Sequence, residues 1–197
     1  GEPIYPTPVI GAVGLTENVD MNCNNVFKSH GDIVILLGRD SVESKFEDLS
    51  GSEYLALMHH TVAGRPSIDL EREILVQKVC RDLIGSGIVS SAHDCSDGGI
   101  AVALAESSIN SYKGFEGNFD LDGRWDIGLF GEAQSRIIVS LTPENMGKFE
   151  ATCESFGVGY CVLGKVNGKK RFVINNFIDI DLELLANTSD DALIGAS

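Results

Sequence analysis

Residues 96–99, with the sequence Ser-Asp-Gly-Gly, have the composition of an anion-binding turn. They follow a short apolar stretch and precede a small-residue run at 100–109, so they are expected to join a strand to a helix. The first N–H groups of a helix lack intrahelical partners and lie at the positive end of its dipole, where they can face a phosphate. Glycines let a ligand approach the backbone closely. We therefore predict Asp97, Gly98 and Gly99 as phosphate- or substrate-binding residues.

The same turn also fits a purely structural role. Asp97 or Ser96 can cap the helix, while Gly98 and Gly99 allow close packing of helix on sheet. The segment is not a Walker loop, since no Gly-Lys-Ser/Thr follows, and it is not a G-x-G-x-x-G fingerprint. Both interpretations stay open from the residues alone.

Other polar residues give weaker patterns. Asp94 and Asp97 are carboxylates of the kind that hold Mg²⁺ on a nucleotide, but their spacing suits two caps or solvated acids equally well, and we predict no metal site. His59 and His60 are adjacent in an expected helix, which excludes a zinc pair at i, i+4, and we expect one exposed and one packed. Arg136 is expected to pair with a carboxylate. No nucleophile–base constellation follows from the spacing, so no catalytic residue is assigned.

The elements that must position the glycine turn are short apolar strands and amphipathic helices. Strands are expected at 33–37, 88–92 and 136–141, and helices at 51–60, 69–84, 100–109 and 142–157, with a further amphipathic segment at 179–185. Strands at 160–166 and 171–174 are predicted to pair across Asn167-Gly168, while 111–126 is expected to be loop or hairpin. This mixture indicates an α+β fold with a mixed or antiparallel sheet covered by helices.

Residues 1–30 differ in character from the rest. Three prolines within 3–8 exclude a regular helix there. Residues 9–15 alternate small and branched side chains, as in an extended segment packed close to another backbone. The polar run 16–31 is typical of a linker. We therefore divide the chain into two parts. Residues 1–30 are expected to be the end of a structural unit whose main part lies upstream, and residues 31–197 are expected to form one α+β domain.

Composition excludes several classes of partner. The net charge of −14 argues against broad contact with nucleic acid or an acidic membrane surface. No run approaches the roughly 20 apolar residues of a membrane helix, and no export signal opens the sequence. We expect a cytoplasmic protein without nucleic-acid or membrane partners. The five cysteines are scattered and are expected to be buried, reduced thiols.

Five segments occur together in an order typical of one enzyme family. They are 5–11 (YPTPVIG), 51–55 (GSEYL), 68–71 (IDLE), 93–106 (HDCSDGGIAVALAE) and 129–136 (LFGEAQSR). In them the chain resembles the C-terminal half-domain of phosphoribosylformylglycinamidine synthase, within the aminoimidazole ribonucleotide synthase-like superfamily. Cys95 and Ser50 are small departures from the pattern.

The resemblance implies a function, cofactors and partners. The family uses ATP to phosphorylate an amide oxygen of formylglycinamide ribonucleotide, and glutamine-derived ammonia then attacks to give formylglycinamidine ribonucleotide. ATP and Mg are implied as cofactors of the full enzyme, and the remaining half-domains and a glutaminase domain or subunit as partners. Residues 1–30 would be the last strand and linker of the preceding half-domain.

The family's catalytic His, nucleotide-binding Lys and most metal-binding acids lie upstream of the matched stretch. The resemblance therefore implies a C-terminal fragment that is inactive by itself and holds no cofactor when isolated. Apolar surface uncovered by such a cut would favour self-association.

Alternatives remain open. Sister families that share the half-domain include aminoimidazole ribonucleotide synthase, selenophosphate synthetase, thiamine-phosphate kinase and a hydrogenase-maturation factor. The combination of Ser-Asp-Gly-Gly with Gly-Glu-Ala-Gln-Ser-Arg favours the glycinamidine synthase. A non-catalytic structural or interaction half-domain is a second alternative. A stand-alone nucleotide-binding module is a third, which the proline-led beginning disfavours.

Overall fold

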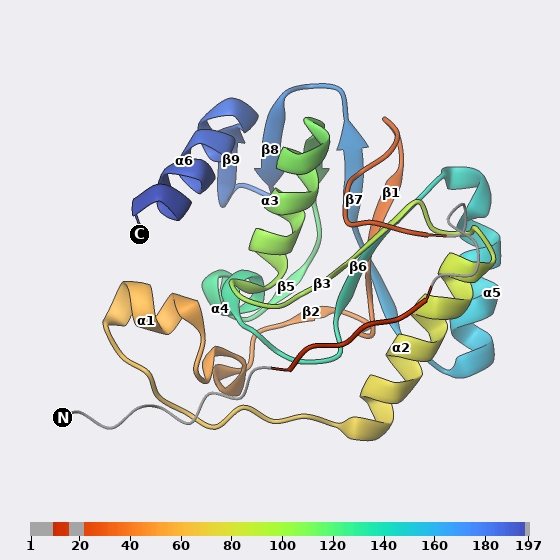
Figure 1. Cartoon of the computed structure of the whole chain (residues 1–197), viewed down its shortest axis with the longest axis horizontal. Coiled ribbons are helices and arrows are strands. Elements are labelled where there is room, and N and C mark those ends of the chain that lie inside the picture. Colours follow the sequence, from red (N-terminus) through yellow and green to blue (C-terminus); the bar gives the residue numbers. More distant parts are fainter. Residues whose placement is uncertain (1–9, 16–21, 196–197) are drawn as a thin grey trace.

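The main sheet has seven strands and carries helices on both faces (Figure 1). The computed structural model describes residues 10–15 and 22–195. The strands, in spatial order, are β3 (Ser91–Asp94), β6 (Ile137–Leu141), β1 (Ile33–Leu37), β7 (Tyr160–Asn167), β4 (Gly114–Gly117), β8 (Arg171–Ile174) and β9 (Ile178–Asp181). β4 and β8 are parallel, and the other neighbours are antiparallel. The predicted α+β class with a mixed sheet is confirmed.

The described residues also form six α-helices and two short 3-10 helices. The α-helices are α1 (Glu53–His59), α2 (Leu70–Gly85), α3 (Gly99–Ser111), α4 (Trp125–Phe130), α5 (Met146–Phe156) and α6 (Leu182–Gly195), and the 3-10 helices are η2 (Phe46–Leu49) and η3 (Pro143–Asn145). A separate parallel pair joins β2 (Val42–Glu43) to β5 (Leu121–Asp122).

Successive side chains of the central strand β1 pack in two different core layers, one on each face of the sheet. Val34 and Leu36 pack in one cluster with residues of α3, whereas Ile35 and Leu37 pack in the other with residues of α2 and α5. Successive side chains of a strand point to opposite faces, so a uniformly apolar strand must be covered twice. The position of α3 over one face places the glycine turn at the end of β3.

The largest difference from the predicted topology is the hairpin at Asn167-Gly168, which was wrong. β7 and β8 are consecutive in sequence but do not pair, because β4 lies between them. Gly114 faces Asn167, and a Cβ at residue 114 would collide with the carbonyl of Lys169. Because Gly114 has no side chain, β4 can lie between β7 and β8 close to the loop that connects them.

The glycine-rich segment 111–126 holds more structure than expected. It contains β4, which is an interior strand, as well as β5 and the start of α4. The strand expected at 88–92 lies at 91–94 instead, and the helix expected from Thr142 is split into η3 and α5. The amphipathic segment at 179–185 spans the end of β9 and the start of α6.

The N-terminal residues that the structure describes differ in how they pack. Val9 lies outside the described residues, and residues 10–15 form no strand. Ile10, Val13 and Leu15 are at least 88% exposed, so within the described part of the chain these side chains have no packing partner. Phe27, by contrast, is 1% exposed and stacks on Phe115 at 6.3 Å between ring centroids. The packed body therefore includes residues before 31.

Two local predictions are confirmed. Asp69 caps α2, where its carboxylate accepts the N–H groups of Glu71 and Arg72. All five cysteines are free thiols; Cys95 is among the buried ones, and burial raises its pKa to about 12. Cys23 and Cys161 are only partly buried.

Candidate functional site

The glycine turn connects β3 to α3 through two residues with positive φ. Gly98 is the N-cap of α3 with φ of 73°, and Gly99 follows with φ of 66°. A Cβ at residue 99 would collide with the carbonyl of Gly131 and lie 3.0 Å from that of Leu129. Only glycine combines this backbone conformation with such close packing. The side-chain cap expected from Asp97 or Ser96 is absent.

Both glycine N–H groups donate to acceptors within the chain. Gly99 N–H donates to the carbonyl of Ser96 at 3.0 Å, as in a turn. Gly98 N–H donates to Oε1 of Glu132 at 2.9 Å, and the same oxygen accepts the N–H of Glu53 at 2.9 Å. One carboxylate oxygen therefore joins the N-terminal ends of α3 and α1.

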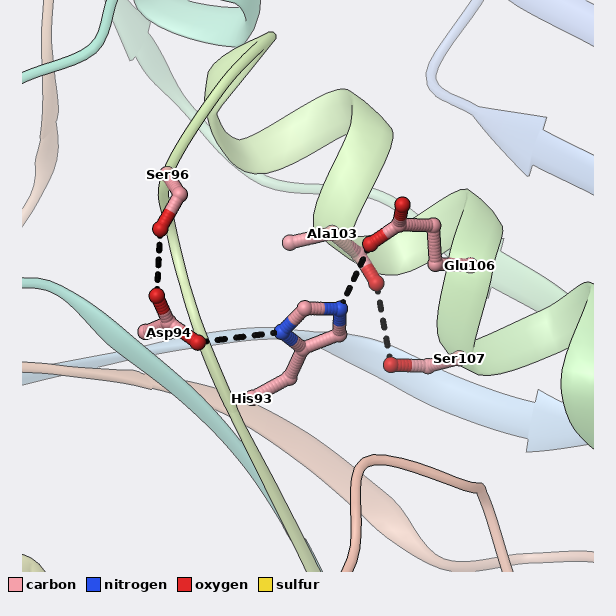
Figure 2. A network of polar contacts seen from close by, with 6 residues as sticks. All are labelled: His93, Asp94, Ser96, Ala103, Glu106 and Ser107. Carbon is pink, nitrogen blue, oxygen red and sulfur yellow. Dashed lines mark hydrogen bonds and ion pairs between the residues drawn. The ribbon is translucent and has the colours of Figure 1, made fainter. Parts of the chain in front are cut away.

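A second polar network fixes β3 beneath α3 (Figure 2). His93 places its Nε2 2.7 Å from Oε2 of Glu106, and its Nδ1 lies 3.6 Å from Oδ1 of Asp94. The Ser96 hydroxyl donates to the other oxygen of Asp94. This bond is the main cause that lowers the pKa of Asp94 below its ordinary value, against the opposing effect of burial. The network orders the strand that carries the turn.

An apolar groove of about 420 Å³ opens beside the turn, between α1 and α3. Its wall consists of Glu53, Tyr54, Leu57, Met58, Asp97, Gly98, Val102 and Phe130. Tyr54 stacks on Phe130 at 5.4 Å between centroids, and its hydroxyl lies 3.1 Å from Oδ2 of Asp126. Of the three predicted binding residues, Asp97 and Gly98 line this groove, whereas Gly99 packs behind it.

The other predicted polar residues do not gather at this groove. His59 and His60 are both exposed, so the expectation that one is packed was wrong. Arg136 is 6% exposed and donates to the carbonyls of Ala133 and Gly131 rather than pairing with a carboxylate. Among the described residues, no three His, Cys, Asp or Glu side chains lie together as a potential metal site.

The comparison with protein families agrees with this fold. Residues 29–175 match the family described as AIR synthase related protein, C-terminal domain. The chain belongs to this family. Curated relatives named phosphoribosylformylglycinamidine synthase subunit PurL are 42% identical over 166 residues in Moorella thermoacetica and 48% identical over 151 residues in Synechocystis. These alignments cover 84% and 76% of this chain but only 22% and 19% of the relatives, so the chain spans about a fifth of their length.

Solved structures share the fold of this AIR synthase related domain. Thermotoga maritima PurL complexed with FGAR matches with a TM-score of 0.68 and 18% identity, over 85% of this chain and 30% of that one. Escherichia coli HypE, a hydrogenase maturation protein, matches with a TM-score of 0.53 and 14% identity, over 81% of this chain and 51% of that one. At these identities the likeness concerns the fold alone.

Sequence reasoning missed the residue that connects the site. Glu132 lies 34 residues from Gly98 and 79 from Glu53, so no local spacing relates them. The motif Gly-Glu-Ala-Gln-Ser-Arg marked this segment without assigning its carboxylate a role. Glu106 was likewise part of a recognised segment, but its contact with His93 appears only in the folded chain.

Proposed function

We propose that this chain forms the C-terminal AIR synthase related domain of a phosphoribosylformylglycinamidine synthase. The full enzyme would convert formylglycinamide ribonucleotide, ATP and glutamine-derived ammonia into formylglycinamidine ribonucleotide. The observation that carries this proposal is the identity of 40% to PurL of Anaeromyxobacter dehalogenans across 98% of the chain. The fold that the chain shares with Thermotoga maritima PurL complexed with FGAR supports it.

We further propose that the described residues support the reaction rather than perform it. Among them, no group of three or more His, Cys, Asp or Glu side chains could hold a metal ion, and the groove wall is largely apolar, so this domain would bind or shape one side of the site. ATP and Mg²⁺ would be held mainly by other domains of the full enzyme. Its partners in the cytoplasm would be the remaining half-domains and a glutaminase domain or subunit. The chain alone would be inactive, would bind no cofactor and would self-associate. Within residues 10–15 and 22–195, no helix is long and apolar enough to cross a membrane.

Asp97, Gly98 and Gly99 remain our proposed contact with a nucleotide or sugar phosphate. Gly98 lines the groove, and the start of α3 favours an anion. Because the Gly98 N–H already donates to Glu132, a phosphate there would share or replace that acceptor. The division into 1–30 and 31–197 also stays a proposal, with Phe27 as the residue that ties the first part to the second.

Steady-state kinetics of the full-length enzyme test the proposal. Wild-type enzyme should turn over formylglycinamide ribonucleotide, ATP and ammonia, whereas the 197-residue chain should not. Gly98→Val should raise the KM for the ribonucleotide, because a side chain at 98 would press on Val102 and enter the groove. A matched control is Gly147→Ala, since a Cβ at 147 has no neighbour within 4 Å. Absence of the ligase activity in the full-length protein would refute the assignment.

A purely structural glycine turn is the second candidate role. Its support is the close approach of Gly99 to the backbone of residues 129–131, together with the internal hydrogen bonds of both glycine N–H groups. Gly98→Val should lower the melting temperature under either role, because residue 98 has a positive φ and a Cβ there would clash with Val102. Under the structural role KM would stay unchanged, so KM separates substrate contact from packing.

A further inference from the structure

Glu132 accepts hydrogen bonds from two helices that belong to different parts of the chain. Its Oε1 lies 2.9 Å from the N–H of Gly98, the N-cap of α3, and 2.9 Å from the N–H of Glu53, the first residue of α1. N–H groups at helix starts lack intrahelical partners, and a carboxylate is the strongest acceptor a side chain can offer them. No salt bridge in the described part of the chain involves Glu132, and its carboxylate is held by these two backbone N–H groups.

The backbone that presents Glu132 is held on both sides. The N–H of Glu132 donates to the carbonyl of Asp48 at 2.7 Å, which fixes it to η2. The buried Arg136 side chain donates to the carbonyls of Gly131 and Ala133. The carboxylate thus projects from a segment that is also held by η2 and by the Arg136 side chain.

Helix α1 depends on few other attachments. None of its residues is buried, and Leu57 and Met58 are 71% and 64% exposed. Tyr54, through its stacking on Phe130 and its bond to Asp126, also ties α1 to the domain. Loss of the Glu132 contact would therefore loosen α1 and the wall of the groove that it forms.

We propose that Glu132 is a positioning residue that locks α1 to the Gly98–Gly99 turn and thereby sets the shape of the groove between α1 and α3. In the folded domain the two helix starts move as one unit because they share one acceptor oxygen. The consequence for substrate binding rests on the proposed function, because it assumes that the ribonucleotide contacts this groove in the full enzyme. The lock itself is a property of the chain.

Amide hydrogen exchange of the 197-residue chain tests the lock directly. In Glu132→Ala the amides of Gly98 and Glu53 should both exchange about tenfold faster or more, the size expected when a hydrogen bond to a charged acceptor is lost. Glu132→Gln keeps an acceptor oxygen and should restore part of the protection at both amides. Glu53→Gln removes a nearby charge but keeps the donating N–H, so it should change exchange at Gly98 by less than about twofold.

Controls separate the lock from general destabilisation. The amide of Ile35, a buried residue of the central strand, should exchange at the same rate in all variants. If Glu132→Ala unfolds the chain, the Ile35 amide will also exchange faster. The exchange rates of the Gly98 and Glu53 amides in Glu132→Gln then test the lock. Faster exchange at only one of the two amides, or at neither, would overturn the proposal.

Kinetics of the full-length enzyme test the functional consequence. Glu132→Gln should raise the KM for formylglycinamide ribonucleotide several-fold more than it lowers kcat, because the ligand site is displaced while the reacting groups lie elsewhere. Coupled exchange with an unchanged KM would overturn the role in substrate binding and leave the lock supported. No ligase activity in the wild-type enzyme would refute the proposed function alone, and the exchange experiment would still decide the lock.

Discussion

Helices α1 and α3 begin at the same carboxylate but are held in place by different forces. Seven residues of α3 are buried, including Ile100 and Leu104 at 0% exposure, and its first glycine contacts neighbouring backbone. Helix α1 buries none of its residues and is attached by Tyr54, the cap Ser52 and Glu132. Hydrophobic burial holds α3 in the core, so α3 should unfold only with the whole domain. Single polar contacts hold α1, so α1 can detach or unfold locally while the sheet stays folded.

The largest expected effect is the loss of core packing under α3. Leu104→Ala should lower the free energy of unfolding by about 2–5 kcal/mol, because it removes buried methyl groups and leaves a cavity. The matched change in α1 is Leu57→Ala, which should cost less than about 0.5 kcal/mol at a side chain that is 71% exposed. Urea denaturation of both variants gives the two values. Equal losses would contradict the contrast between the helices.

The next effect concerns the backbone at the start of α3. Gly99→Ala should destabilise the domain by about 2–4 kcal/mol, since alanine is strained at φ of 66° and its Cβ would meet the Gly131 carbonyl. Gly147→Ala in α5 should instead stabilise by up to about 1 kcal/mol, because its Cβ meets no neighbour. Thermal melts of the pair measure the difference. A neutral Gly99→Ala would show that the turn tolerates relaxation.

A smaller and more local effect is expected at the start of α1. The Ser52 hydroxyl accepts the N–H of Leu55 at 3.3 Å, and Ser52→Ala should cost about 1 kcal/mol of helix stability. Because α1 buries nothing, the loss should appear as faster amide exchange within 53–59 rather than as a lower melting temperature. A fall in melting temperature without local exchange would show that α1 unfolds only with the sheet.

The smallest effect is the pH dependence of the Tyr54 attachment. The Arg124 guanidinium, and then the Tyr54 hydroxyl, hold the pKa of Asp126 below its ordinary value of 3.8, although burial opposes them. A carboxyl whose pKa is lower in the folded state contributes stability above its unfolded pKa and loses it as the pH falls through the folded pKa. Below about pH 4, Asp126→Asn should therefore lose stability less steeply than wild type. Urea midpoints measured between pH 6 and pH 2 test this, and parallel curves would contradict it.

Elements with local signals could be predicted from the amino-acid sequence. The apolar run at β1, the capped start of α2 and the glycine start of α3 were all predicted, because strand burial, N-capping and positive φ depend on adjacent residues. The recognised segments also placed the chain in a family whose C-terminal domain it matches.

Contacts between segments that are far apart in the chain could not be predicted in this way. The insertion of β4 between β7 and β8 overrode a strong hairpin signal, because pairing follows the completed sheet and not the turn alone. Gly98 and Glu53 both donate to Glu132, which lies 34 and 79 positions away from them in the chain. Residue spacing cannot predict a contact over such a separation. The glycine turn was therefore visible in the sequence, whereas the acceptor that holds it to α1 was not.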